Sequence, residues 1–548
     1  MSYQAETRRR RTFAIISHPD AGKTTLTEKL LLFSGAIQIA GSVKARKATR
    51  HATSDWMEIE KQRGISVASS VMQMVYRDHV INLLDTPGHK DFSEDTYRVL
   101  TAVDAALMVI DAANGVEAQT RRLIEVCRQR NTPIITFVNK MDREVREPLE
   151  LLDEIERELG MSCVPLTWPV GQGKHFGGIV NLRTQAMTVF QSGQDRRPQD
   201  FDTVPLTQVD VLHKRFGQDF EQAEANMELV SGASPTFDRE EFLAGKQTPV
   251  FFGSGVNNFG VMEVLDALVD LAPSPQPRTS SLIPPKAPPG TEPIVKCVLP
   301  EDEAFSGVVF KVQANMDPSH RDRIAFVRIC SGKYSPGLKL KVQRTGKELR
   351  PTSVVTFMSQ RREAVEEAYA GDIVGFTTHG GVQLGDTITD GSVALQFTGL
   401  PFFAPELFQT VILKNPLRTK QLQQGLAQLG EEGAIQVFRP NVGGPMLLGA
   451  VGQLQFEVVQ HRLKGEYDAD IRLESCQYVG ARWITADTLQ ELRSFSDAYP
   501  MRMALDAANT LAYLTTSPYD VRLAQERFPK IHFHPLREHA GLALQSAG

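Results

Sequence analysis

The segment that most constrains this chain is an apolar run followed by a short polar loop and a helix pattern. Phe13–Ile16 has the composition of a buried strand, and Leu26 and Leu30 recur on one face of a helix. The loop between them fits the pattern G-x-x-x-x-G-K-[ST], except that serine replaces the first glycine. A strand and a helix joined in this way predict a doubly wound α/β domain with a phosphate-binding loop. Its residues are Ser17, His18, Pro19, Asp20, Ala21, Gly22, Lys23 and Thr24.

The loop supplies two kinds of ligand for a nucleotide. Its backbone N–H groups and the helix N-terminus favour phosphate oxygens. Lys23 offers a point charge to the β- and γ-phosphates, and the hydroxyl of Thr24 is a candidate Mg²⁺ ligand. Taken alone, the motif leaves an alternative open, namely a glycine-containing strand–helix turn with an exposed lysine.

A second polar segment follows the apolar run Val80–Leu84. We expect Asp85 to hold a magnesium-bound water, and the N–H of Gly88 to sense the γ-phosphate. A plain turn would use the same residue types, but it would not explain a phosphate loop earlier in the same domain. The segment consists of Asp85, Thr86, Pro87, Gly88 and His89.

The third polar segment follows Ile134–Val138 and predicts the base. A carboxylate at Asp142 can accept hydrogen bonds from the N1–H and the N2 amino group of guanine, which adenine does not offer, so the site would select GTP and GDP. Asn139 would tie this loop to the phosphate loop, and Lys140 would cover one face of the base. The backbone at Ser254 could meet guanine O6, with a bare turn as an equal alternative. The segment is Asn139, Lys140, Met141 and Asp142.

The rest of the chain predicts several domains. A polar stretch at about 163–248 interrupts the strand–helix alternation and suggests an insertion, and residues 273–293 hold eight prolines, which suggests a linker. Short β-type runs then predict a barrel, and a mixture of helices and strands follows it. We expect a GTP-binding domain at 1–272, a β-barrel domain II at 294–398, and an α+β domain III with a C-terminal tail at 399–548.

Composition excludes several classes of protein. The net charge of −5 gives no global cationic field, although local basic patches remain possible. The five cysteines are scattered, which argues against a zinc site or a disulfide framework and suits a reducing cytosol. No run approaches the ~18 apolar residues of a membrane span. We therefore expect a cytoplasmic protein without membrane contact, with a monomer as the default. Arg8–Arg11 suggests a solvated arm or, as the less favoured alternative, a nucleic-acid contact.

These motifs together resemble the translational GTPases, the family of elongation factors that visit the ribosome. Arg63–Ser66 is similar to the family's switch I signature, usually Arg-Gly-Ile-Thr, and the segment ending at His89 is similar to its switch II. The resemblance implies that Ser66 is a second protein ligand of Mg²⁺. It also implies that His89 orients the attacking water and that Lys23 stabilises charge during catalysis. Pro19 and Ile65 fall where the family places an apolar gate.

The resemblance continues past the GTPase domain. Arg323–Ile329 and Ala370–Gly375 look like the family's second-domain barrel, and Val451–Val458 looks like a helix start in its third domain. Too few residues remain after it for the two further domains of the translocase branch. The phosphate loop, Asp55–Glu58 and the Arg-Gly-Ile-Ser variant most resemble the class II release factors.

That branch implies a ribosome-dependent GTPase acting in translation termination. Its partners would be ribosomal RNA and proteins, and it would promote dissociation of class I release factors indirectly, after peptide release. Peptide hydrolysis is not implied, because the chain has no Gly-Gly-Gln tripeptide. Two alternatives stay open: a ribosomal GTPase in translocation or ribosome protection, and a scaffold that binds GTP without hydrolysing it.

Overall fold

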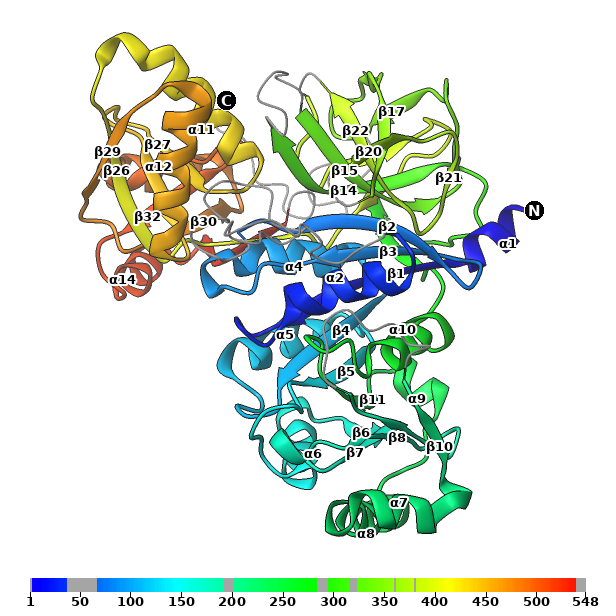
Figure 1. Ribbon diagram of the computed structural model, residues 1–548. Helices are drawn as coiled ribbons and strands as arrows, with labels where there is room; N and C mark the ends of the chain where they lie inside the picture. Colours follow the sequence, from blue (N-terminus) through cyan, green and yellow to red (C-terminus); the bar gives the residue numbers. More distant parts are fainter. Residues whose placement is uncertain are drawn as a thin grey trace.

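The computed structural model describes residues 2–36, 67–191, 201–282, 294–314, 323–358, 361–378 and 381–538. Figure 1 shows three parts in mutual contact: an α/β part, a barrel above it, and an α+β part beside the barrel. The predicted fold class is confirmed. Within the described ranges, no helix combines the length and the apolarity that a bilayer crossing requires.

The α/β part is built on a seven-stranded sheet in the order β2-β3-β1-β4-β5-β11-β6. All neighbours are parallel except β2, which runs antiparallel to β3. Because helices cover both faces, the central strands are apolar and buried throughout. The strands are β1 (Arg10–Ser17), β2 (Ser70–Tyr76), β3 (His79–Asp85), β4 (Ala105–Asp111), β5 (Ile134–Asn139), β6 (Ser162–Pro165) and β11 (Gln247–Phe252). The helices are α2 (Lys23–Phe33), α4 (Ser93–Ala102), α5 (Ala118–Gln129), α6 (Pro148–Leu159) and α10 (Val261–Asp270).

The polar stretch between β6 and β11 forms a separate layer below this sheet (Figure 1). It contains a four-stranded antiparallel sheet in the order β10-β9-β8-β7, with helices beside it. Since β6 belongs to the main sheet, the extra layer begins after Pro165. Its elements are β7 (Thr167–Val170), β8 (Gly178–Asn181), β9 (Ala186–Val189), β10 (Thr203–Pro205), α7 (Val209–Phe216), α8 (Gln218–Ala233) and α9 (Arg239–Leu243).

The proline-rich segment is not simply a linker. Within it, β12 (Arg278–Leu282) pairs antiparallel with β13 (Ile294–Val298) and with β24 (Gln396–Phe397). The sequence pattern does not predict this strand, because β12 is polar and prolines flank it. Residues 283–293 lie outside the described ranges.

The barrel part is built on an antiparallel sheet in the order β18-β17-β23-β14-β15-β22-β19-β20. A bulge in the pairing with β15 bends β14 between Val309 and Lys311. The strands are β14 (Ser306–Ala314), β15 (Arg323–Ser331), β17 (Leu340–Val342), β18 (Glu348–Leu349), β19 (Val354–Met358), β20 (Arg361–Ala364), β22 (Ile373–Thr378) and β23 (Thr387–Thr389). A small ladder adds β16 (Lys333–Tyr334) and β21 (Ala368–Tyr369).

The last part is a sheet in the order β29-β26-β28-β27-β31-β32-β30-β33 with four helices. The segment after Gly480, which the sequence pattern left unassigned, is folded around a cluster of aromatic rings centred on Phe495. The strands are β25 (Pro401–Phe403), β26 (Leu407–Leu413), β27 (Gln436–Pro440), β28 (Leu447–Ala450), β29 (Ile471–Ser475), β30 (Gly480–Ala486), β31 (Met503–Leu505), β32 (Leu511–Thr515), β33 (Ile531–His534) and β34 (Leu536–Glu538). The helices are α11 (Thr419–Glu431), α12 (Gln453–Tyr467), α13 (Leu489–Ala498) and α14 (Asp520–Arg527).

The N-terminal arginine run joins the α/β part to the barrel. Its first residue, Arg8, ends the short helix α1 (Tyr3–Arg8). Arg10 is 5% exposed and pairs with Glu6 and with Asp372 of the barrel, while Thr12 donates to the carbonyl of Gly371 at 2.7 Å. The prediction of a solvated arm is therefore wrong at Arg10, whose guanidinium forms an ion pair between two domains.

We expect a side chain at Gly371 to weaken this junction. A Cβ there would lie 2.5 Å from Pro275 Cγ and 2.8 Å from Arg10 Cβ, and the residue has a φ of +103°. Gly337 is a matched control, because its φ is +88° and a Cβ there meets nothing within 4 Å among the described residues. Gly371→Ala should lower the free energy of unfolding by about 1–3 kcal/mol more than Gly337→Ala. Thermal unfolding measures both, and equal melting temperatures would contradict the expectation.

Candidate functional site

The predicted phosphate loop lies between β1 and α2 and lines a cavity of about 350 Å³. Parts of all three predicted segments meet there, because the carboxyl ends of β1, β3 and β5 share one edge of the sheet. Gly22 has a φ of +98°, and a Cβ at this position would overlap the Asn139 amide. The lining residues are Ser17, His18, Pro19, Asp20, Gly22, Lys23, Thr24, Thr25, Gly88, His89, Asn139, Lys140, Arg143 and Val256.

The charged pair of the site is Lys23 with Asp85. The lysine ammonium donates to Oδ1 of Asp85, and the two side chains are only 6% and 2% exposed. Asp85 Oδ2 is buried and has no hydrogen-bond partner among the described residues. Thr86 fastens the strand end by donating to the carbonyl of Ile15 at 2.7 Å. An unpaired buried carboxylate oxygen beside the Thr24 loop is the kind of hard donor that Mg²⁺ prefers, directly or through water.

The described ranges hold no cluster of three or more His, Cys, Asp or Glu side chains that could hold a metal. Two of the three predicted metal ligands, Thr24 and Ser66, carry hydroxyls and are not among these residue types. Ser66 lies outside the described residues, as do the rest of Arg63–Ser66 and Asp55–Glu58.

Asn139 connects the loops that follow β1, β5 and β11. Its side chain is 2% exposed, and its Nδ2 donates to the carbonyl of Ala21 at 2.8 Å. Its Oδ1 accepts from the N–H groups of Lys140 and Gly255, both at 2.9 Å. A single amide therefore fixes the phosphate loop against the segments predicted to read the base.

Lys140 is held by a residue that sequence reasoning missed. It has a φ of +73°, and its ammonium donates to the carbonyl of Asp20 at 2.6 Å and to Asp111 Oδ2 at 2.7 Å. Asp111 ends β4, so its place at the carboxyl end of an expected strand was an available signal.

The residues predicted to read the base differ in burial. Met141 is fully buried, and Asp142 is half-buried. Ser254 is 1% exposed, and its N–H donates to the carbonyl of Phe259 at 2.9 Å. In the described structure that N–H is therefore already used in a hydrogen bond within its own turn.

His89 stands at the edge of the cavity. Its side chain is about one-third exposed, and the N–H of Asp91 donates to its Nδ1 at 3.3 Å. Gly88 lies against Pro19, because a Cβ at Gly88 would sit 3.5 Å from Pro19 Cα. His18 Nε2 lies 3.1 Å from a Glu117 carboxylate oxygen. The Pro87 carbonyl accepts from the hydroxyl of Thr96 on α4 at 3.2 Å.

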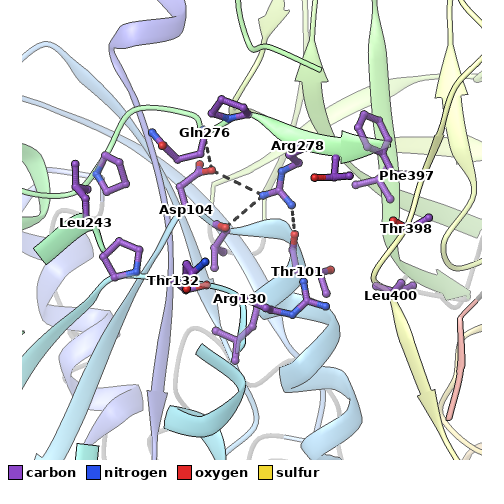
Figure 2. Close-up of a pocket in the computed structure, with 18 residues that line it drawn as sticks. Thr101, Asp104, Arg130, Thr132, Leu243, Gln276, Arg278, Phe397, Thr398 and Leu400 are labelled. Carbon is purple, nitrogen blue, oxygen red and sulfur yellow. Dashed lines mark hydrogen bonds and ion pairs between the residues drawn. The ribbon is translucent and has the colours of Figure 1, made fainter. Parts of the chain in front are cut away.

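A second cavity of about 320 Å³ lies between the α/β part and β12, and Figure 2 shows Arg278 at its centre. Arg278 contacts Asp104 and donates to the carbonyl oxygens of Thr101 and Val103. Burial lowers the pKa of the Arg278 guanidinium, which nevertheless stays charged because arginine starts so high. No predicted site residue lines this cavity, so it is separate from the candidate site.

Family models divide the chain into three matched regions. The GTP binding domain of elongation factor Tu matches residues 8–274, and domain 2 of elongation factor G matches residues 304–391. The C-terminal domain of class II release factor RF3 matches residues 397–525.

Full-length relatives and a solved structure agree with these matches. Peptide chain release factor 3 of Bordetella pertussis (strain Tohama I) is 65% identical over 99% of both chains. The protein of the same name from Nitrosomonas europaea is 64% identical over the full length of both. The crystal structure of a protein from Thermus thermophilus superposes with a TM-score of 0.67 and 25% identity, covering 87% of this chain and 69% of that one.

The α/β domain and its match to a GTP-binding family identify a GTPase that binds GTP and GDP. The expected β-barrel and α+β regions are likewise matched by family models. The chain therefore belongs to the peptide chain release factor 3 family, the class II release factors of translation termination.

Proposed function

We propose that this GTPase is stimulated by the ribosome and uses GTP to promote dissociation of class I release factors after peptide release. The observation that carries the proposal is the set of hydrogen bonds by which Asn139 joins the phosphate loop to the loops that follow β5 and β11. It occurs in a chain whose relatives carry the name peptide chain release factor 3 over their full length. The class I factor would be reached indirectly, through the ribosome.

In this proposal the phosphates lie in the cavity beside Lys23, and the base reaches past Lys140 to Asp142, which is not one of the lining residues. The backbone of Ser17–Gly22 would donate to the phosphates, with the positive end of α2 behind it. Lys23 would move its charge from Asp85 to the β- and γ-phosphates. Asp142 would accept from guanine, and the N–H of Ser254 would have to leave the Phe259 carbonyl to meet O6. The other proposed binding residues are Thr24, Thr86, Pro87, Gly88, His89, Asn139, Lys140 and Met141.

Magnesium would be held by Thr24 and Ser66, with Asp85 acting directly or through water. The free oxygen of Asp85 supports this assignment, since its other oxygen is occupied by Lys23. When bound, the ion would neutralise charge on the β- and γ-phosphate oxygens.

For hydrolysis, the chain's own residues would position water and stabilise charge. His89 would orient the attacking water, and Lys23 would stabilise charge on the transferred phosphoryl group. The sequence nominates no arginine for the second task, so we expect slow intrinsic turnover. Binding to the ribosome would complete the site by placing His89.

The proposal includes a monomer that works in the cytoplasm. Five scattered cysteines suit a reducing compartment. Since the ribosome is the surface on which the GTPase acts, a second copy of the chain is not required.

Replacing His89 should separate hydrolysis from binding. His89→Ala should lower the single-turnover rate on ribosomes by at least about 100-fold, because the water loses its orienting group. Phosphate release is measured beside GTP affinity, so that weaker binding is not mistaken for slower chemistry. His461→Ala, at an exposed histidine of α12, is the control. A rate near wild type for His89→Ala would refute its role.

Changing the carboxylate at Asp142 should change the base. Asp142→Asn should lower GTP affinity at least about tenfold, because an amide cannot accept both guanine donors. Xanthosine triphosphate should bind better than GTP, since its O2 accepts from the new amide. Competition binding measures the preference, with Asp153→Asn, exposed on α6, as the control. Retained GTP preference would show that another residue reads the base.

The role in termination is tested with a limiting class I factor and an excess of ribosomes carrying finished peptides. With GTP, this protein should allow each class I factor to release many peptides. The first round should be unaffected, because peptide hydrolysis belongs to the class I factor. A translocation assay run in parallel should give no stimulation. Stimulated translocation without class I turnover would replace the proposed role with that of an elongation-type GTPase.

A further inference from the structure

A residue next to His89 caps a helix of another domain. The helix α12 begins after Gly452, which has no side chain to accept from the free N–H groups of the first turn. Asp91 supplies the missing acceptor, because its Oδ2 accepts from the N–H of Leu454 at 2.9 Å. Leu454 is the second residue of the helix, the position that a capping side chain normally serves.

The contact is closely fitted. A Cβ at Gly452 would overlap the Asp91 carboxylate, so only glycine allows this approach. Gln455 Oε1 accepts from the N–H of Val451 at 2.7 Å and of Gly452 at 3.3 Å, which leaves Leu454 N–H for Asp91. Asp91 is 5% exposed, and its negative charge sits at the positive end of a 15-residue helix.

Apolar contacts surround the cap. Phe92 and Val458 are buried together with Val67, and Leu454 packs against them. Val67 is the first described residue after the switch I signature at 63–66. The start of α12 therefore contacts chain segments adjoining both predicted switches.

The same aspartate also faces His89. Its N–H donates to His89 Nδ1 at 3.3 Å, and its Oδ1 lies 3.4 Å from that nitrogen. One oxygen of this carboxylate thus accepts from the first turn of α12, and the other lies beside the imidazole of His89. A shift of α12 would change the position of Asp91 and, through it, the orientation of the His89 ring.

We infer that Asp91 is a positioning residue, through which the docking of α12 sets the orientation of His89 and so the rate of GTP hydrolysis. The inference rests on the proposed role of His89. The C-terminal part of the chain would thereby control chemistry in the GTPase domain, because a side chain of the GTPase domain caps a helix of the C-terminal part.

The first test changes a residue of the C-terminal part and leaves every residue of the candidate nucleotide site as it is. Gly452→Ala should push Asp91 away from α12. Gly465→Ala, in the same helix, is the control, because a Cβ there meets nothing within 4 Å in the described part of the chain. On ribosomes, Gly452→Ala should lower kcat for GTP about tenfold with KM for GTP within about twofold, as expected when a group is misplaced but substrate contacts remain. Gly465→Ala should match wild type.

Substitutions at Asp91 separate positioning from general damage. Asp91→Asn keeps an oxygen that can accept from Leu454 N–H and should retain most of kcat, whereas Asp91→Ala should resemble Gly452→Ala. The double variant Asp91→Ala/Gly452→Ala should be no slower than either single variant, because both remove one contact. Additive losses, or equal losses for Asp91→Asn and Asp91→Ala, would overturn the inference.

His89→Ala shows whether a negative result concerns the role of Asp91 or the proposed role of His89. If His89→Ala is slow but Gly452→Ala matches Gly465→Ala, the inference fails and the proposed role of His89 stands. If His89→Ala hydrolyses GTP at the wild-type rate, the proposed role itself fails, and with it the route through Asp91.

Discussion

The three hydrogen bonds of the Asn139 side chain are the interaction on which the nucleotide site depends. They join loops that follow β1, β5 and β11, so the segments predicted to bind the phosphates and to read the base keep a fixed separation. Because the amide is buried, losing either its donor or its acceptor would leave unpaired groups at a cost of about 1–3 kcal/mol each. The Lys140–Asp111 pair adds a second tie across the same edge of the sheet.

A second set of contacts extends this rigidity to the other domains. On α4, Arg98 donates to the carbonyl of Gly433, and Glu94 accepts from Gln436, both on the C-terminal part. Burial raises the pKa of the Glu94 carboxyl, while Arg98 beside it opposes that rise. From the barrel, Lys311 donates to the carbonyl of Ser69, just after the switch I segment. The segments that follow both predicted switches therefore make charged contacts with two other domains.

Local patterns predicted which loops meet, since each motif follows a strand whose carboxyl end must reach the same sheet edge. The structure brings Lys23, Asp85 and Asn139 together as this rule requires. Partners across domains were not predictable, because residue spacing says nothing about which surfaces meet. Thus the burial of Arg10 against the barrel and the cap that Asp91 gives α12 appear only in the structure. Strand β12 was not predicted, because the prolines on either side of it made the whole segment resemble a linker.

The proposed role in termination is tested most directly by the residence time of a labelled class I release factor on single ribosomes whose peptide has been released. Residence is recorded with this protein and GTP, with GDP in its place, and without the protein. We expect GTP to shorten residence markedly relative to both other conditions. Equal residence times in all three conditions would contradict the central claim, and the GTPase would need another role on the ribosome.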